Sequence, residues 1–359
     1  MTPPLQPASV DELRAAVLSA PRVLAVGAGT KPRLAVVEAV KISTARLRGI
    51  IEYEPDEFTF TALAGTPVRE IAGALAERGQ YLPFDPPLLD AGATIGGTVA
   101  AGLNGPGRMR YGGLRDFILA VRFVDGSGRL LRAGGKVVKN AAGFDLPKFF
   151  VGSLGRFGVL AEITFKVFPR PGARRTLEFS VADDAAVASG LMELAASRWE
   201  PDAIDARPLE HKVYLRLAAP EGAIGEICRD ALARRPGRQM PEDEAAGFWT
   251  DQCEFRWAHP DGVWLKIAST PARIPEVAGL AQRLPGTRVH VSAGGNLVLL
   301  SLPDAGAIAT VTDGLCALGL PALTLRGDAP LRPGAPPLPA IAAAVKAALD
   351  PDHRFPAYT

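Results

Sequence analysis

Residues 92–98 read Gly-Ala-Thr-Ile-Gly-Gly-Thr and lie within residues 82–113, a long segment that has neither a helical nor a strand period. The segment is rich in Gly, Pro and small side chains. A stretch of this length without regular structure is uncommon inside a compact domain unless it binds something. What this segment binds is the question that decides fold and function.

Two other glycine-rich runs accompany it, Gly-Ala-Gly-Thr-Lys at residues 27–31 and Gly-Ser-Leu-Gly-Arg-Phe-Gly at residues 152–158. Residues without bulky side chains let backbone N–H groups approach a phosphate, and consecutive N–H groups form an anion-binding nest. Taken singly, each run is more often a simple turn. Taken together, the three runs predict a site for a diphosphate.

Two common phosphate-binding motifs are excluded. None of the three runs is a Walker A loop, because no Gly-Lys-Ser/Thr follows four variable residues. None is a G-x-G-x-x-G that opens a helix directly after a strand. The sequence therefore fits neither a kinase nor a Rossmann fold.

The composition is that of a globular protein. The chain has 359 residues, of which 48% are hydrophobic and 22% charged, and this length predicts two domains or one large two-layer unit. The net charge of +2 and the lack of a basic run argue against a nucleic-acid partner. The longest apolar stretch, residues 91–103, is too short to span a bilayer, and residues 1–4 do not resemble a signal peptide. We expect a cytoplasmic protein without a transmembrane segment.

Cysteine and histidine are sparse. The chain has three cysteines and four histidines, with no C-x-x-C and no H-x-x-x-H: Cys228, Cys253, Cys316, His211, His259, His290 and His353. We expect each cysteine to be a buried apolar thiol. The sequence predicts no metal site and no iron–sulfur cluster held by this chain alone.

Helix and strand signals alternate through residues 1–171. Ser9 and Glu12 form a capping box, and Thr66 as N-cap with Pro67 at the first helical position predicts a second helix that ends before Gly79. Residues 117–124 and 159–168 are typical of strands. A Pro-Arg-Pro-Gly run at residues 169–172 ends this part, so we place a domain boundary after residue 171.

The C-terminal part, residues 172–359, predicts a different architecture. Strands are expected near residues 176–181, 213–217, 263–268 and 296–302, with helical patterns between them. Strands separated by helices in a mostly antiparallel layer suggest a ferredoxin-like sheet. The fold class is therefore α+β, with this region as the smaller domain.

In their order, the N-terminal motifs resemble the FAD-binding domain of the p-cresol methylhydroxylase and vanillyl-alcohol oxidase family. The resemblance covers nearly all of residues 1–171 and is carried by residues 26–31, 84–87, 94–97, 110–112, 116–119 and 152–159. Within the family, the chain is similar to the E subunits of glycolate oxidase, a likeness that residues 82–87, 105–112 and 136–145 carry. It implies a two-part FAD-binding domain followed by a small cap or substrate domain.

The resemblance also implies which residues hold FAD. They are Val26, Gly27, Ala28, Gly29, Thr30, Lys31, Thr94, Ile95, Gly96, Gly97, Thr98, Ala101, Gly102, Tyr111, Gly158 and Val159. Some relatives attach FAD covalently through a His in the first loop, but this loop contains none. We therefore expect non-covalent FAD. Lys31 is either a partner of the phosphates or a solvated loop residue.

The substrate motif of the family's 2-hydroxy-acid dehydrogenases, H-x-G-D-G-N-L-H, is degenerate here. Only Gly-Gly-Asn-Leu remains at residues 294–297, Val298 stands where the second His is expected, and His290 is out of register. His290 is expected to be a core or rim histidine. The family's D-P-x-x-x-F-N-P-G ending survives only in part, as Asp-Pro at 350–351 and Phe-Pro at 355–356. No base or metal ligand set is evident, so the catalytic residues are unknown.

Three functions stay open on these grounds. The first is an FAD-binding subunit of a multi-subunit glycolate oxidase or dehydrogenase, beside a sister flavin subunit and an iron–sulfur subunit, with any membrane association through those partners. The second is a self-sufficient FAD-dependent oxidoreductase. The third is an assembly subunit that binds no flavin.

Overall fold

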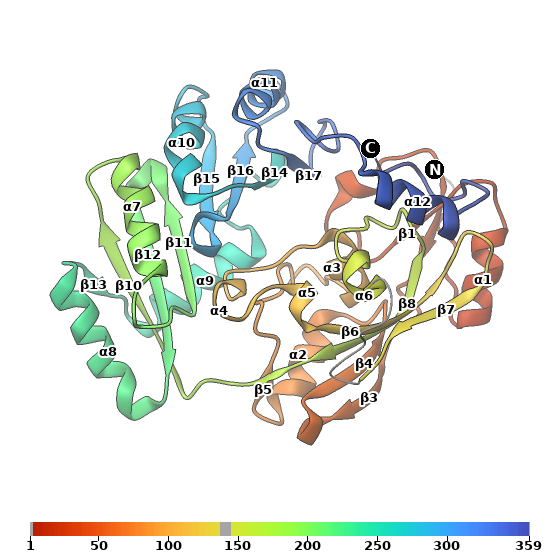
Figure 1. Ribbon diagram of the computed structural model, residues 1–359, viewed down its shortest axis with the longest axis horizontal. Helices are drawn as coiled ribbons and strands as arrows, with labels where there is room; N and C mark the ends of the chain where they lie inside the picture. Colours follow the sequence, from red (N-terminus) through yellow and green to blue (C-terminus); the bar gives the residue numbers. More distant parts are fainter. Residues whose placement is uncertain (1–2, 137–144, 359) are drawn as a thin grey trace. The chain divides into compact units, whose positions relative to one another are not determined.

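The computed structural model describes residues 3–136 and 145–358, which form two compact units (Figure 1). The first unit comprises residues 1–104, 112–170 and 337–359, and the second comprises residues 105–111 and 171–336. The chain passes from one unit to the other at residue 170, next to the expected boundary. However, residues 337–359 belong to the first unit and not to the C-terminal domain where we expected them. Residues 137–144, which carry part of the likeness to the E subunits, lie outside the described residues.

The first unit is built around one antiparallel sheet. The strands of the whole unit are β1 (Val23–Val26), β2 (Val40–Ser43), β3 (Ile50–Glu54), β4 (Thr59–Leu63), β5 (Gln80–Tyr81), β6 (Ile118–Val124), β7 (Leu130–Gly134), β8 (Val159–Lys166) and β9 (Phe168–Pro169). Its helices are α1 (Val10–Leu18), α2 (Val68–Ala76), α3 (Ile95–Ala101), α5 (Leu114–Phe117), α6 (Leu146–Phe150) and α12 (Ala340–Leu349), with short 3-10 turns η1 (Pro32–Ala35) and η2 (Pro55–Glu57). The main sheet has the order β3-β4-β8-β6-β7, while β1 pairs with β2 in parallel and β5 with β9.

Two helix starts in this unit illustrate local sequence rules. Ser9 Oγ accepts a hydrogen bond from Glu12 N at 3.2 Å, as the capping box predicts. The prediction for α2 was wrong by one residue, because the helix begins at Val68 and Pro67 is its N-cap. The Thr66 hydroxyl does not cap the helix. It accepts a hydrogen bond from Gly49 N at 2.8 Å, and the carbonyl oxygens of Gly49 and Leu63 lie within donating distance of it.

The glycine-rich segment is less irregular than its sequence suggests. Residues 95–101 form α3, which is capped by Thr94, whose Oγ1 accepts a hydrogen bond from Gly97 N at 3.3 Å. No apolar period marks this helix, because its side chains are almost all small. Phe84 anchors the preceding part of the segment, since its buried ring packs against Phe117 and Phe165 with ring centroids 6.0 Å away in both cases. Burial of this aromatic cluster fixes the segment on the sheet.

The C-terminal segment is held in the first unit by a buried ion pair. Lys346 Nζ on α12 donates to Asp350 Oδ2 at 2.5 Å, to the Arg156 carbonyl at 2.6 Å and to the Phe355 carbonyl at 2.9 Å. Asp350 also accepts hydrogen bonds from the backbone N–H groups of Arg354 and Phe355. Phe355 is buried in a cluster with residues of α1, β1 and β8. These contacts explain why residues 337–359 are part of this unit.

The second unit has an eight-stranded sheet in which every pair is antiparallel. Its strands are β10 (Ala173–Ser180), β11 (Ala203–Arg207), β12 (Lys212–Ala219), β13 (Arg238–Gln239), β14 (Val263–Ala268), β15 (Arg288–Ser292), β16 (Leu297–Leu302) and β17 (Ala322–Arg326). Its helices are α4 (Arg108–Tyr111), α7 (Asp184–Ala195), α8 (Glu221–Arg234), α9 (Glu242–Glu254), α10 (Ile274–Gln282) and α11 (Ile308–Leu318), with turns η3 (Pro208–Glu210), η4 (Pro271–Arg273) and η5 (Ala293–Gly295).

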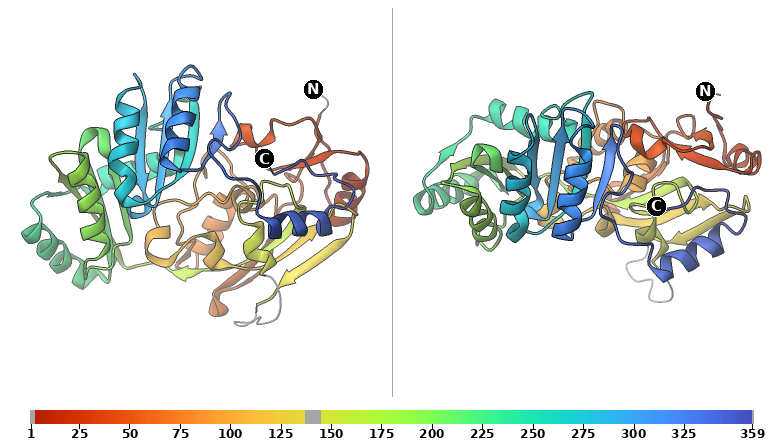
Figure 2. Two further views of the ribbon diagram at one scale, coloured as in Figure 1. Left: turned by 45° about the horizontal axis from the view of Figure 1, so that its top comes forward. Right: turned by 90° about the horizontal axis from the view of Figure 1, so that it is seen from above.

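This sheet contains the ferredoxin-like arrangement twice. The order β13-β10-β12-β11 and the order β17-β14-β16-β15 are the same pattern of fourth, first, third and second strand, and the two halves meet where β11 pairs with β15. Helices α7, α8, α10 and α11 cover one face and share one apolar core (Figure 2). We expected a single ferredoxin-like sheet in a smaller domain; the repeat makes this unit nearly as large as the first. In the described residues, no helix is both long and apolar enough to cross a bilayer.

Substitution Asp350→Asn should destabilise the first unit by about 3 kcal/mol, because it leaves the buried Lys346 charge without its partner. The matched control Asp352→Asn, at an exposed carboxylate, should change the free energy of unfolding by about 0.5 kcal/mol or less. Chemical denaturation followed by circular dichroism measures both values. Equal effects of the two variants would show that the buried pair does not hold the C-terminal segment.

Candidate functional site

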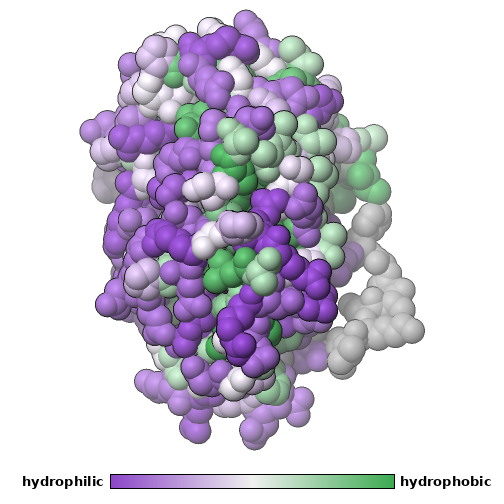
Figure 3. Space-filling model, turned by 90° about the vertical axis from the view of Figure 1, so that its left-hand side faces the viewer, coloured by the Kyte–Doolittle hydropathy of each residue, from purple (hydrophilic) through white to green (hydrophobic). Residues whose placement is uncertain are grey.

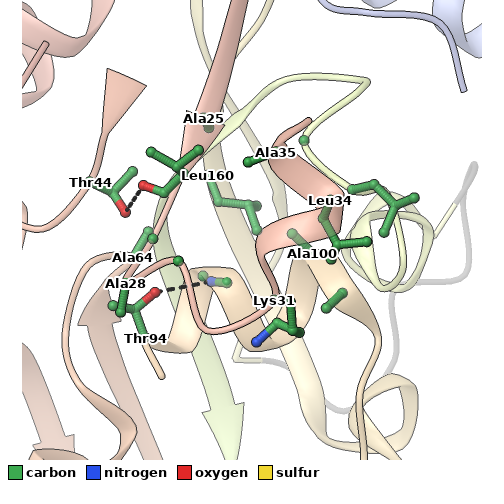
Figure 4. A pocket seen from close by; sticks show the side chains of 18 of the residues that line it. Ala25, Ala28, Lys31, Leu34, Ala35, Thr44, Ala64, Thr94, Ala100 and Leu160 are labelled. Atoms are coloured by element: carbon green, nitrogen blue, oxygen red, sulfur yellow. Dashed lines mark hydrogen bonds between the residues drawn. The ribbon is translucent and has the colours of Figure 1, made fainter. Parts of the chain in front are cut away.

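A cavity in the first unit brings all three glycine-rich runs together (Figure 4). The space inside it, together with the open solvent at its mouth, is about 770 Å³. Among the predicted site residues, those that line it are Val26, Gly27, Ala28, Gly29, Thr30, Lys31, Thr94, Gly96, Gly97, Ala101 and Gly158. Residues more than 120 positions apart in the chain therefore line the same cavity.

The first wall is the loop after β1, and Gly27 is its fixed point. A Cβ atom on Gly27 would collide with the Thr94 hydroxyl, so only glycine allows this loop to lie against the start of α3. The Thr44 backbone N–H donates to the Val26 carbonyl at 3.0 Å and holds the end of the strand. The loop is thereby fixed next to α3 with its backbone toward the cavity.

The second wall is the start of α3, where Gly96 and Gly97 have different roles. A Cβ on Gly96 would lie 2.8 Å from the Ala64 carbonyl oxygen, so Gly96 is needed for packing against the main sheet. A Cβ on Gly97 would meet only the Thr94 hydroxyl, at 3.0 Å, and would otherwise occupy open space on the cavity side. Gly97 therefore keeps this side open for a ligand.

The third wall is the run at residues 152–158, which the backbone ties to α3. Gly152 N donates to the Val99 carbonyl at 2.9 Å, and Leu154 N donates to the Ala100 carbonyl at 2.8 Å. Gly155 has a φ of +69°, in the left-handed region that favours glycine. The Ser153 side chain lines the cavity, and its buried hydroxyl has no hydrogen-bond partner among the described residues. An unsatisfied buried hydroxyl of this kind favours a polar ligand.

The cavity has the electrostatic character of an anion site. Lys31 is the one charged side chain among the residues that line it, and no Asp or Glu lines it in the described chain. Its Nζ donates to Thr30 Oγ1 at 2.8 Å. Burial lowers the pKa of Lys31 to about 8, because the ammonium group is poorly hydrated there. A bound phosphate would restore the balance of charge.

Five predicted site residues do not line the cavity. Ile95, Thr98 and Val159 are buried in the packing around it, and Gly102 takes a left-handed conformation against the backbone of residue 152. Tyr111 lies in the second unit, where the Arg110 guanidinium group stacks on its ring. The motifs in which these residues stand include structural positions as well as binding positions, and the pattern alone does not separate them.

Several lining residues were missed by sequence reasoning. They are small or apolar side chains without a binding signature: Ala25, Leu34, Ala35, Thr44, Ala64, Ala100, Leu154 and Leu160. Ser153 and Gly155 also line the cavity and belong to the third glycine-rich run, from which only Gly158 was predicted as a site residue. The glycine-rich pattern of this run could have identified both of them. Apolar walls of this kind suit the rings of a nucleotide or flavin.

The remaining sequence candidates lie elsewhere. His290 is a core histidine, as expected: it is buried in the second unit, and its Nε2 lies 2.6 Å from Asp205 Oδ2. The pairing with Asp205, 85 residues away, was missed. Cys228 is buried as expected, but Cys316 is exposed, which contradicts our expectation for it. No group of three or more potential metal ligands occurs in the part of the chain that the structure describes.

Comparison with known proteins identifies the domain around the cavity. Residues 4–134 match the family model described as FAD binding domain. The chain contains an FAD-binding domain. The three loops fit this cofactor, because they present backbone next to a cationic side chain for the diphosphate and an apolar wall for the rings.

The relatives agree with the resemblance seen in the sequence. The chain is 39% identical to the glycolate oxidase subunit GlcE of Escherichia coli over 203 residues, which are 56% of this chain and 55% of that protein. It is 30% identical to the glycolate oxidase subunit GlcD of Bacillus subtilis over 244 residues, 66% of this chain and 51% of the other. The matches thus span little more than half the length of these two proteins.

A solved structure shares the fold of this chain. The structure of p-cresol methylhydroxylase with substrate bound superposes with a TM-score of 0.74 over 97% of this chain and 87% of that one, at 14% identity. The fold class that we expected is confirmed.

Lys31 should react faster with an amine acylating reagent near pH 8 than an ordinary exposed lysine. With a pKa of about 8 it is substantially neutral at this pH, whereas an ordinary lysine, pKa about 10.4, is almost fully protonated. FAD should protect Lys31, because the diphosphate covers the amine and raises its pKa. Peptide mass spectrometry measures the labelling, with the exposed Lys166 as the internal control. If FAD leaves the labelling of Lys31 unchanged, this residue does not contact the phosphates.

Proposed function

We propose that this protein is the FAD-binding subunit of a multi-subunit glycolate oxidase or dehydrogenase. The observation that supports the proposal is the cavity formed by the three glycine-rich runs, in a chain with 39% identity to GlcE over 203 residues. Bound FAD would supply a two-electron acceptor for the oxidation of a 2-hydroxy acid such as glycolate to the corresponding 2-oxo acid. The protein's own residues bind and orient the cofactor.

We propose that FAD binds without a covalent bond. The first loop offers Ala28, Thr30 and Lys31 but no histidine, and no cysteine occurs before Cys228. Affinity would then rest on hydrogen bonds from the loop backbone to the diphosphate, on the Lys31 charge and on apolar contact. A flavin held in this way is released when the protein unfolds.

The subunit role includes two partners in the proposal, a sister flavin subunit and an iron–sulfur subunit. The three cysteines are far apart, and Cys228 is buried while Cys316 is exposed, so they do not form a ligand set for a cluster. Electrons leaving a flavin here would need a relay from another chain. On the face of the molecule drawn in Figure 3, apolar side chains of the described residues lie in small separate areas, which does not single out a docking surface. We propose a cytoplasmic location.

One observation bears on the second candidate, a self-sufficient oxidoreductase. His290 and Asp205 form a carboxylate–imidazole pair, the combination that commonly supplies a general base. The pair is completely buried, and Ser292 Oγ donates to the second Asp205 oxygen at 2.8 Å. A base has to reach its substrate, so this burial favours a structural role for the pair. An assembly subunit without flavin is the third candidate, and flavin content tests it.

Substitution Gly97→Asp should abolish FAD binding in a folded protein. It adds bulk and negative charge where the diphosphate is proposed, and the repulsion at short range in a partly buried site is on the order of several kcal/mol. The control Gly73→Asp adds the same charge at an exposed position with open space around it. FAD released by acid precipitation and quantified by its absorption gives the occupancy. Equal occupancy in both variants would place the diphosphate elsewhere.

The isolated chain should not reduce its flavin when glycolate or D-lactate is added without oxygen, because no accessible base is evident among its residues. The measurement is the anaerobic loss of the flavin absorption band. The chain should also co-purify with a larger flavin subunit and a cysteine-rich subunit. Rapid bleaching by the lone chain would contradict the subunit role and favour the self-sufficient enzyme, and His290→Gln would then show whether the buried pair takes part.

A further inference from the structure

Arg156 is a buried arginine next to the cavity wall. Only 2% of its surface is exposed, and it lies in the third glycine-rich run between the cavity-lining Gly155 and the buried Phe157. Its Nη2 donates to the carbonyl of Leu34 at 3.3 Å, and Leu34 itself lines the cavity. The guanidinium group therefore lies behind the part of the cavity lining that η1 forms.

The charge of this arginine is not balanced by a carboxylate. Arg156 forms no ion pair among the described residues, and its Nε and Nη1 are buried without a hydrogen-bond partner there. The Nε and Nη1 atoms together carry three of the five guanidinium N–H donors, and so many unused donors are unusual for a group that is always charged. A buried, incompletely satisfied guanidinium group is costly unless something else completes it.

Several cationic side chains lie near Arg156, together with the Tyr358 phenol, which acts to raise the pKa of Arg156. Burial, with Arg33 as a second cause, lowers the pKa of Arg156 to about 10. Arg156 in turn contributes to the lowered pKa values of Lys41 and Lys346, in both cases after burial itself. The carboxylate near Lys346, that of Asp350, is already occupied by this lysine and by two backbone N–H groups. The region behind η1 thus has a positive potential.

This potential adds to that of Lys31, which is the charged residue in the cavity lining. The Ser153 hydroxyl, three residues before Arg156, is a buried polar group in the same run without a partner in the described structure. Lys31 and Ser153 line the cavity, which has no acidic side chain in its lining, and the Arg156 guanidinium lies behind the wall at Leu34. An anion inside the cavity would compensate a charge that pairs with no carboxylate among the described residues.

We propose that Arg156 is a further binding residue that supplies positive charge to the phosphate groups of FAD in this cavity. This inference rests on the proposed FAD site and names one residue of it that motif reasoning did not assign. The protein accepts a destabilising buried charge in the cofactor-free state, and the cofactor's phosphates relieve it. Sites built for function commonly carry such a local loss of stability.

The test compares the cofactor-free wild type with Arg156→Gln, Arg156→Lys and the control Arg115→Gln. Glutamine keeps one donor for the Leu34 carbonyl but removes the charge, lysine keeps the charge, and Arg115 is an exposed arginine in the same unit. FAD affinity is measured by flavin fluorescence at two salt concentrations, and thermal unfolding of the cofactor-free proteins is measured in parallel.

Arg156→Gln should weaken FAD binding by about tenfold or more and reduce its salt dependence, since it removes a buried positive charge close to the phosphates. The cofactor-free variant should unfold at the same or a higher temperature than the wild type. Arg156→Lys should recover most of the affinity, and Arg115→Gln should match the wild type.

Two outcomes overturn the inference while leaving the proposed function intact. One is unchanged FAD affinity in Arg156→Gln. The other is a parallel loss of affinity and of cofactor-free stability that lysine does not rescue, which would show that Arg156 only supports the loop. If the wild type itself binds no FAD, the proposed function fails, and the inference fails with it.

Discussion

The contact between the Gly27 backbone and the Thr94 hydroxyl is the constraint on which the site depends. The hydroxyl caps α3 through Gly97 N, and the first loop can approach it only because residue 27 has no side chain. The third run is then fixed to α3 by two backbone hydrogen bonds at Val99 and Ala100. A helix of small residues thus becomes the centre to which both other loops attach, and all three line one cavity.

The sequence was sufficient to predict this convergence, but not its details. Glycine-rich runs are a sequence signal for accessible backbone, and the predicted residues 27–31, Thr94, Gly96 and Gly97 do line one cavity, although what they bind there remains a proposal. Helix α3 and the lining residues Leu34 and Ala100 were missed, because small apolar side chains have no period or motif that separates a wall from a core. Arg156 was not singled out from the sequence, since burial and missing partners are properties of the folded chain.

The same limits apply to the fold. The strand near residue 263 was predicted because its residues are continuous and apolar, whereas β13, two exposed residues long, had no signal. The doubling of the ferredoxin-like pattern depends on strand order, which emerges only when distant strands pair, as β11 does with β15. The return of residues 337–359 to the first unit depends on one buried pair, Lys346 with Asp350, whose members look like ordinary helix-surface residues in the sequence.

The most direct test of the account is a crystal structure of the chain with FAD. The account predicts the diphosphate within hydrogen-bond distance of backbone N–H groups of residues 27–31 and next to the start of α3, with the Lys31 amine and the Arg156 guanidinium on the same side of the phosphates. FAD bound at another place, or a diphosphate that points away from these loops, would contradict it.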